Sequence, residues 1–262
     1  MSVPFAIQAR SLVLPLLAIG ALLAACDDDP PKSTGGKGAS TSTAATTAAP
    51  TPPAPIKPKG MPELTVDNDG PYLGGTRINL ADPQGAEKLA KVVKELPING
   101  AAVTLIVEKK AKTSSVAAVV AALGEAGAPK VTIKTDGRDD LPKEITVTPE
   151  VRVASLPACT VTTMVLKDLS TAIWPVKGGT AKKQRKGMAG PDLSNTGEQI
   201  TKDLAGCDST IALFSGDEAV PWENAFNLAG TALKADEKKK IETLVLPREA
   251  PVAGRAVTLS KH

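Results

Sequence analysis

The chain has 262 residues, a formal net charge of +3 and only 2 % aromatic residues. The small net charge gives no support for nucleic-acid binding, which favours a strongly basic domain. The scarcity of aromatic residues argues against an aromatic-lined cleft for a sugar or small molecule. Histidine occurs once, as His262, so the chain is short of the residue on which catalytic triads and most zinc sites depend. We therefore expect no catalytic residues, no metal, no cofactor and no enzymatic activity.

The first feature in chain order is an apolar run at residues 11–25, which follows Arg10 and precedes Cys26. Its length is typical of a secretory signal peptide and is below the roughly 20 apolar residues that span a membrane. Its end, Leu-Ala-Ala-Cys, resembles a bacterial lipobox, in which the signal is cut before the cysteine and the thiol receives a lipid with acyl chains such as palmitate. The alternative is an ordinary secretory signal followed by an unmodified cysteine. We expect a lipoprotein signal peptide over residues 1–25 and lipid attachment at Cys26.

A linker follows, over residues 26–60, in which Pro, Gly, Ser, Thr and Ala predominate and Ile56 is the one large apolar residue. Such a segment buries too little surface to offset its chain entropy, so we expect it to be disordered. Asp27, directly after the lipidated cysteine, resembles the inner-membrane retention signal of enteric bacteria; the alternative is the start of a solvated linker. We expect a protein anchored in a bacterial membrane and facing the periplasm, with the inner membrane favoured over the outer.

Two further cysteines, Cys159 and Cys207, lie in the second half of the chain. Export would bring them into an oxidising compartment, where a remaining pair of cysteines favours a disulfide. The alternative is two buried free thiols. We predict a disulfide between them.

The first half of the remaining chain alternates short apolar strands with amphipathic helices. One helix is predicted over residues 83–96, with Asp82 as N-cap and apolar residues at helical spacing. Thr113 or Ser114 is expected to cap a second helix, which ends before Gly127. The predicted strands are residues 63–70, 71–80, 101–107, 130–135 and 143–148.

The second half repeats this order. Gly-Gly-Thr occurs at residues 74–76 and again at 178–180, and the apolar strand 209–216 matches 101–107 in character. Helices are predicted over residues 195–204 and 221–233. The predicted strands are residues 160–166, 171–176, 209–216, 240–246 and 254–260. We expect an α+β protein with two similar small domains, 61–149 and 150–262, each a mixed sheet with two helices packed on one face.

The segment from residue 103 to 135, with its strand, charged turn, helix, Gly127 and closing strand, resembles the periplasmic domain of the ExbD/TolR biopolymer-transport family. Residues 211–230 are similar, and Val220-Pro221-Trp222 stands where that family often carries a Val-Pro-aromatic step. The resemblance covers roughly 70 residues in each half. It implies a tandem repeat of a partner-binding periplasmic domain, in which the two copies pair within the chain or form a homodimer.

One departure from the family bears on function. Members that couple to proton flow carry an acidic residue inside an N-terminal transmembrane helix, whereas residues 11–25 contain none. We therefore predict a non-catalytic binding or scaffold module with a periplasmic protein or cell-wall partner. The alternative is an accessory subunit of a transport complex of the ExbB/ExbD or TolQ/TolR type, driven by the proton-motive force.

Charged turns supply the remaining candidates. Glu108, Asp217 and Glu218 would be the carboxylates of an enzyme, if one existed, but they occupy turns where charge keeps a hairpin tip hydrated. The turns at 137–140 and 216–218 could hold a cation, although neither has calcium-loop spacing. The basic run 182–188 is either a solvated hairpin tip or a contact for anionic lipid or cell-wall polymer.

Overall fold

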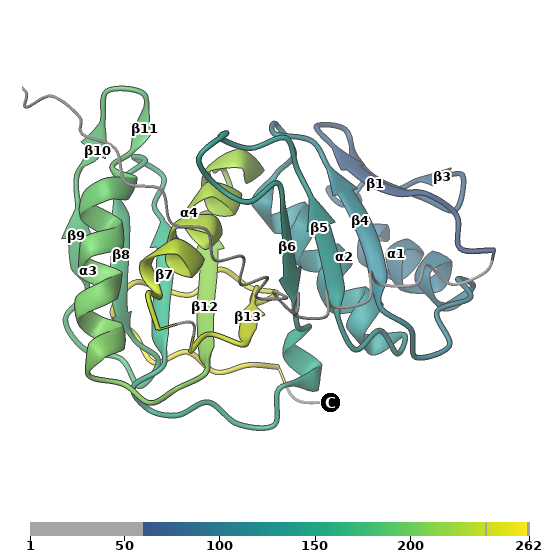
Figure 1. Cartoon of the computed structure of the whole chain (residues 1–262). Coiled ribbons are helices and arrows are strands. Elements are labelled where there is room, and N and C mark those ends of the chain that lie inside the picture. The colour runs from purple at the N-terminus through teal and green to yellow at the C-terminus, as the bar shows by residue number, and fades with distance from the viewer. Residues whose placement is uncertain (1–59, 239, 261–262) are drawn as a thin grey trace, which may run out of the picture. The chain divides into compact units, whose positions relative to one another are not determined.

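The computed structural model describes residues 60–238 and 240–260. This part of the chain contains four α-helices, one eleven-stranded mixed sheet and one two-stranded sheet (Figure 1). The α+β class predicted from the sequence is therefore confirmed. The predicted signal peptide, Cys26, Asp27 and all of the predicted linker except Gly60 lie outside the described residues.

The first half begins with three antiparallel strands and continues with parallel strands joined through helices. Strand β1 runs antiparallel to β2 and parallel to β4, β4 runs parallel to β5, and β5 runs antiparallel to β6. The elements are β1 (Leu64–Asp67), β2 (Gly70–Leu73), β3 (Thr76–Arg77), α1 (Gly85–Lys94), β4 (Val103–Val107), α2 (Thr113–Glu125), β5 (Val131–Lys134), β6 (Glu144–Val147) and the short 3-10 helix η1 (Glu150–Arg152).

The second half has the same order of strands and helices, with a small hairpin added before its first helix. Strand β7 runs antiparallel to β8 and parallel to β12, and β12 runs parallel to β13. The elements are β7 (Val161–Val165), β8 (Thr171–Pro175), β9 (Lys182–Gln184), β10 (Lys186–Gly187), β11 (Gly190–Pro191), α3 (Leu193–Ala205), β12 (Ile211–Gly216), α4 (Trp222–Ala235) and β13 (Thr243–Val245).

The strands of the two halves join into one sheet in the order β3-β2-β1-β4-β5-β6-β13-β12-β7-β8-β9. Strand β6 lies between the halves. It pairs with β5 over four residue pairs but with β13 only through Leu244 and Val147. The structure thus differs from the predicted arrangement of one sheet per half, because a single backbone pairing carries the sheet across the boundary.

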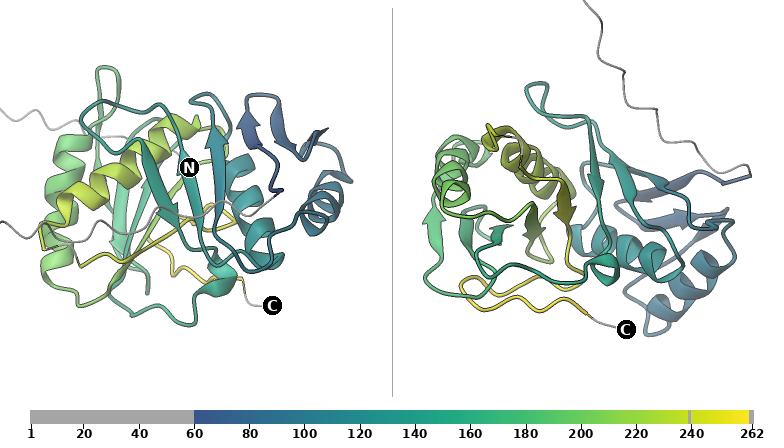
Figure 2. Two further views of the ribbon diagram at one scale, coloured as in Figure 1. Left: turned by 45° about the vertical axis from the view of Figure 1, so that its right-hand side comes forward. Right: turned by 60° about the horizontal axis from the view of Figure 1, so that its bottom comes forward.

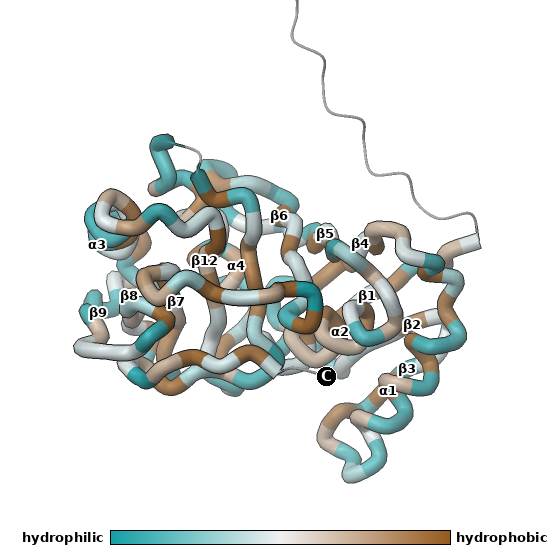
Figure 3. Tube along the Cα trace, turned by 90° about the horizontal axis from the view of Figure 1, so that it is seen from below, coloured by the Kyte–Doolittle hydropathy of each residue, from teal (hydrophilic) through white to brown (hydrophobic). Residues whose placement is uncertain are grey.

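In each half the helices pack against one face of the strands. Side chains alternate between the two faces of a strand, and one set lies in the core together with helix residues. Leu105, Ile133 and Phe214 belong to a core cluster that includes residues of α1, α2 and α4, and Ile173 belongs to one that includes residues of α3 and α4. Figure 3 shows hydrophobic residues along β12 and hydrophilic residues along the outer strand β9. None of the helices in the described ranges is long and apolar enough to cross a membrane.

A second junction joins the halves where α2 and α4 begin. The amide of Trp222 donates to the carbonyl of Ala111 at 2.7 Å, and the amide of Thr113 donates to the carbonyl of Val220 at 3.3 Å. The Trp222 indole is fully buried, donates to the Thr135 hydroxyl at 2.8 Å and packs between Phe214 and Phe226. The Val-Pro-Trp step therefore ties α4 to the first half.

Four local predictions were wrong. Neither Thr113 nor Ser114 caps α2, because Lys112 is the N-cap and the Thr113 hydroxyl donates to the Val220 carbonyl at 2.8 Å. Asp82 does not cap α1, because its carboxylate accepts from the Asn79 amide and the helix begins only at Gly85. The predicted strand 71–80 divides into β2 and β3, because Gly74 and Gly75 form a turn with φ of 57° and 84°. Residues 254–260 form no strand. They do not join the sheet. The Val257 amide donates to the carbonyl of Val176, directly after β8, and the Trp174 indole of β8 donates to the Arg255 carbonyl.

Candidate functional site

A groove lies on the face of the sheet opposite the helices, in the second half. Its two walls are the segments 153–158 and 256–260, and Val176 and Lys177 close it between them. The cavity has a volume of about 690 Å³. This lies in the range of roughly 300–1,000 Å³ that is usual for ligand sites.

The C-terminal wall follows from an apolar pattern that packs on the sheet. Val257 and Leu259 are half-buried and contact Val176, Leu213 and Val245, which point away from the helices. Figure 2 shows this C-terminal segment, in yellow, on the side of the sheet away from α3 and α4.

Three hydrogen bonds fasten the same segment. The Val257 amide donates to the Val176 carbonyl at 2.8 Å, and the Gly179 amide donates to the Gly254 carbonyl at 2.8 Å. The Trp174 indole donates to the Arg255 carbonyl at 2.9 Å. Glycine is needed at this crossing, because Gly254 has a φ of 82° and a Cβ there would lie 2.8 Å from the Gly179 oxygen.

The other wall begins at η1 and carries the groove's one acidic side chain. Glu150 is only 3 % exposed, and its Oε2 accepts from the Arg248 amide at 3.2 Å. Its Oε1 has no hydrogen-bond partner among the described residues. Arg152 holds η1 against α2 by donating to the Gly124 carbonyl at 2.9 Å. The groove therefore combines apolar walls with one buried carboxyl group and the exposed Lys177.

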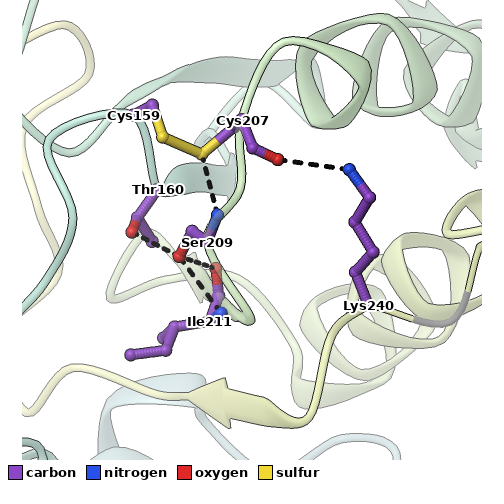
Figure 4. Close-up of a disulfide and its surroundings, with 6 residues drawn as sticks. All are labelled: Cys159, Thr160, Cys207, Ser209, Ile211 and Lys240. Atoms are coloured by element: carbon purple, nitrogen blue, oxygen red, sulfur yellow. Dashed lines mark hydrogen bonds between the residues drawn. A yellow bond between two sulfur atoms is a disulfide. The ribbon is translucent and has the colours of Figure 1, made fainter.

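A disulfide holds the end of this wall. It joins Cys159 to Cys207, the pair predicted from the sequence, with the Cα atoms 5.6 Å apart (Figure 4). The Ser209 hydroxyl lies 2.7 Å from the Thr160 hydroxyl, and the Ser209 amide donates to the Cys207 sulfur at 3.4 Å. These contacts hold the end of the segment 153–158 against the residues that precede β12.

The three carboxylates considered for catalysis do not line a common hollow. Glu108 is exposed beside Lys109 and Asp136, whereas Glu218 lines another hollow with Ser114 and Arg248. Asp217 is half-buried and lines neither of these two hollows.

The acidic turn at 137–140 is an ion-pair network in the structure. Asp140 accepts from the Arg138 guanidinium at 2.9 and 3.1 Å, which lowers the pKa of Asp140. Hydrogen bonds from Lys109 and then Lys143 lower the pKa of the neighbouring Asp136. Within residues 60–238 and 240–260, no group of three or more Asp, Glu, Cys or His side chains is placed to hold a metal ion.

The first half presents a second, flatter hollow at the ends of β4 and β5. It is lined by the charged residues Glu108, Lys109, Lys134, Asp136, Lys143 and Glu144, together with Ile106, Val107 and Thr135. Ile106 is 42 % exposed at its edge. The groove of the second half is the better candidate, because apolar walls release free energy when an apolar ligand covers them.

The sequence did not predict the groove. Segment 153–158 lacks any periodic pattern, so nothing indicated that it would cover a sheet face. The alternation of Val257 and Leu259 is visible in the sequence and predicts a strand, not a segment that covers a sheet face. The chain matches no known protein-family model, no curated protein sequence and no solved structure.

Proposed function

We propose that the protein is a lipid-anchored extracytoplasmic binding module without enzymatic activity, and that the groove on the second half takes an extended, largely apolar segment of a periplasmic partner. The Leu-Ala-Ala-Cys motif supports anchoring through Cys26, and the linker 26–60 would let the folded part stand away from the bilayer.

The observation that carries the proposal is the pair of walls. Two chain segments outside the helices and strands, 153–158 and 256–260, flank the cavity. Segments of this kind favour an extended ligand, whose alternate side chains can enter the space between them. Val153, Leu156 and Val257 offer an apolar lining, and the Glu150 carboxyl group and the Lys177 ammonium group offer polar contacts.

A tandem repeat of two ExbD/TolR-like domains, 61–149 and 150–262, is the second part of the proposal. The neighbour order β3-β2-β1-β4-β5 has the counterpart β9-β8-β7-β12-β13 with matching strand directions, which supports a duplicated unit. The reciprocal bonds between residues 111–113 and 220–222 support pairing of the copies within one chain.

Crosslinking mass spectrometry on intact cells tests the binding function. Lys177 lines the groove and is exposed, whereas Lys88 is exposed on α1 in the first half and does not line the groove. We expect an amine-reactive crosslinker to join Lys177 to a partner protein repeatedly and Lys88 rarely. Lys177→Arg keeps the charge and should abolish the crosslink. Equal yields from both lysines, or none from Lys177, would contradict a groove that binds a protein.

Anchoring is tested separately by Cys26→Ser. We expect the unchanged protein to incorporate labelled palmitate and to sediment with membranes, and the variant to incorporate none. Palmitate incorporation in the variant would contradict attachment at Cys26.

The repeat also supports a second function, that of an accessory subunit in a transport complex driven by the proton-motive force. Here the partner would be a channel-forming membrane protein of the ExbB/TolQ type, favouring the inner membrane as the location. Co-purification of such a protein in mild detergent would support this function, and normal uptake and envelope integrity in a deletion strain would contradict it.

A further inference from the structure

The β10–β11 hairpin projects beyond the end of the main sheet, next to β9 (Figure 1). Its turn consists of Met188 and Ala189, between the paired residues Gly187 and Gly190. Met188 has a relative exposed area of 109 %, the highest of the large hydrophobic residues described as exposed. An apolar side chain held fully in water at a hairpin tip is not explained by packing within the fold.

The strands beside this tip are strongly basic. Residues 182–190 contain four cations, Lys182, Lys183, Arg185 and Lys186, and no acidic residue. Lys182 forms an ion pair with Asp203. Arg185 and Lys186 are exposed and form no ion pair with any other residue in the described ranges.

Two carboxylates of this part of the fold have other partners. Asp192 lies beside Gly187, but its side chain caps α3 by accepting from the Asn195 amide at 3.1 Å. Asp168 accepts from the Ser170 hydroxyl at 2.6 Å. The positive charge of Arg185 and Lys186 is thus left available for an external anion.

We propose that this hairpin is a contact site for anionic phospholipid, with Arg185 and Lys186 at the headgroups and Met188 in the interface. A basic element with an apolar tip suits a bilayer surface, where anionic headgroups lie above apolar acyl chains. This inference goes beyond the proposed function, since it concerns how the folded part meets the bilayer and does not depend on what the groove binds.

A single dye can test the contact. Cys26 is acylated in the proposed form and Cys159 is bonded to Cys207, so Met188→Cys would supply one free thiol. The labelled protein is reconstituted in vesicles of phosphatidylcholine or phosphatidylglycerol that contain a quencher-bearing lipid. The matched control is Val252→Cys, which is 58 % exposed and distant in sequence from the hairpin.

We expect strong quenching at position 188 in phosphatidylglycerol vesicles, weak quenching in phosphatidylcholine, and weak quenching at position 252 in both. High salt should reduce the signal. Replacing both Arg185 and Lys186 by Gln should lower the equilibrium constant of the lipid contact about 25-fold, because each lost cation lowers it about fivefold. Equal quenching at both positions, or at position 188 in both lipids, would overturn the proposal.

Two results separate this inference from the proposed function. If acylation fails, the Cys26 thiol is free and the dye labels it as well. Adding Cys26→Ser to each variant then restores a single label, and the uncut apolar run at residues 11–25 holds the chain in the membrane. The dye comparison stays valid, because both label positions share the same anchor. Binding of the hairpin to isolated cell wall, with no quenching in either vesicle, would overturn the lipid contact in favour of a polymer contact.

Discussion

The two halves of the sheet share the order of their strands but differ on the face away from the helices. In the first half this face carries Thr104, Ile106, Lys134 and Thr146, and no segment of residues 60–238 or 240–260 covers it. In the second half it carries Met164, Trp174, Leu213 and Val245, and the chain's own segments cover it. The difference shows that a duplicated order of elements can yield two different surfaces, because one set of alternate strand positions decides whether a face is covered.

The polar residues of the open face lie in register across three strands. Thr104 pairs with Thr132, which pairs with Thr146, and the hydroxyls of Thr132 and Thr146 lie 3.2 Å apart. β-Branched polar side chains suit a hydrated sheet face. The groove with apolar walls is therefore built in the second half, where apolar residues hold the covering segments.

The largest expected effect comes from breaking the junction between the halves. Trp222→Ala should lower the free energy of unfolding by about 5 kcal/mol, because it removes a fully buried side chain and its bond to Thr135. Urea unfolding followed by far-UV circular dichroism measures this effect. The control Trp222→Phe keeps most of the packing and should cost less. Equal stability of the unchanged protein and Trp222→Ala would show that the junction is not needed.

Loss of the disulfide should affect the two halves differently. It closes a loop between positions 48 residues apart. Replacing both Cys159 and Cys207 by Ala should lower the free energy of unfolding by about 4 kcal/mol through chain entropy. Amide hydrogen exchange should then become faster in β7 and β12, whereas the exchange rates in β4 and β5 should remain unchanged. Uniform acceleration in both halves would instead indicate that they unfold as one unit.

Matched substitutions on the face away from the helices test whether this face is covered in the second half and open in the first. Leu213→Ala should cost about 3 kcal/mol, because Leu213 is 1 % exposed under the covering segments. Ile106→Ala, on the corresponding face of β4, should change stability by less than about 0.5 kcal/mol, because Ile106 is 42 % exposed. Denaturant midpoints of the two variants measure both. Similar costs would contradict the description of one face as covered and the other as open.

The smallest effect concerns an ion pair at the edge of the open half. A hydrogen bond from Arg77 lowers the pKa of Asp67. The pair is therefore fully stabilising above the ordinary aspartate pKa of about 3.9 and loses this contribution as the pH falls through the lowered value. Asp67→Asn should cost under about 1 kcal/mol at neutral pH and nothing in strong acid. Glu63→Gln is the control, and an equal pH dependence in both variants would contradict the assignment.

The sequence predicted the α+β class and most elements because their apolar periodicity is local. Val103 to Val107 and the helix containing Val116 and Val120 follow from such patterns. The continuation of the sheet through β6 was not predictable, because it depends on one distant pairing between Leu244 and Val147. The groove was missed for the same reason, since the covering role of Val257 and Leu259 depends on residues such as Leu213 on a remote strand.

In-cell photo-crosslinking tests whether the groove of the second half is the surface that binds a partner. A photoreactive residue at Ser155, exposed in the groove wall, is compared with one at Thr146, exposed on the open face of β6. We predict a discrete crosslinked species from position 155 that Leu156→Asp abolishes, and none from position 146. A species from position 146 alone, or from neither position, would contradict the proposal.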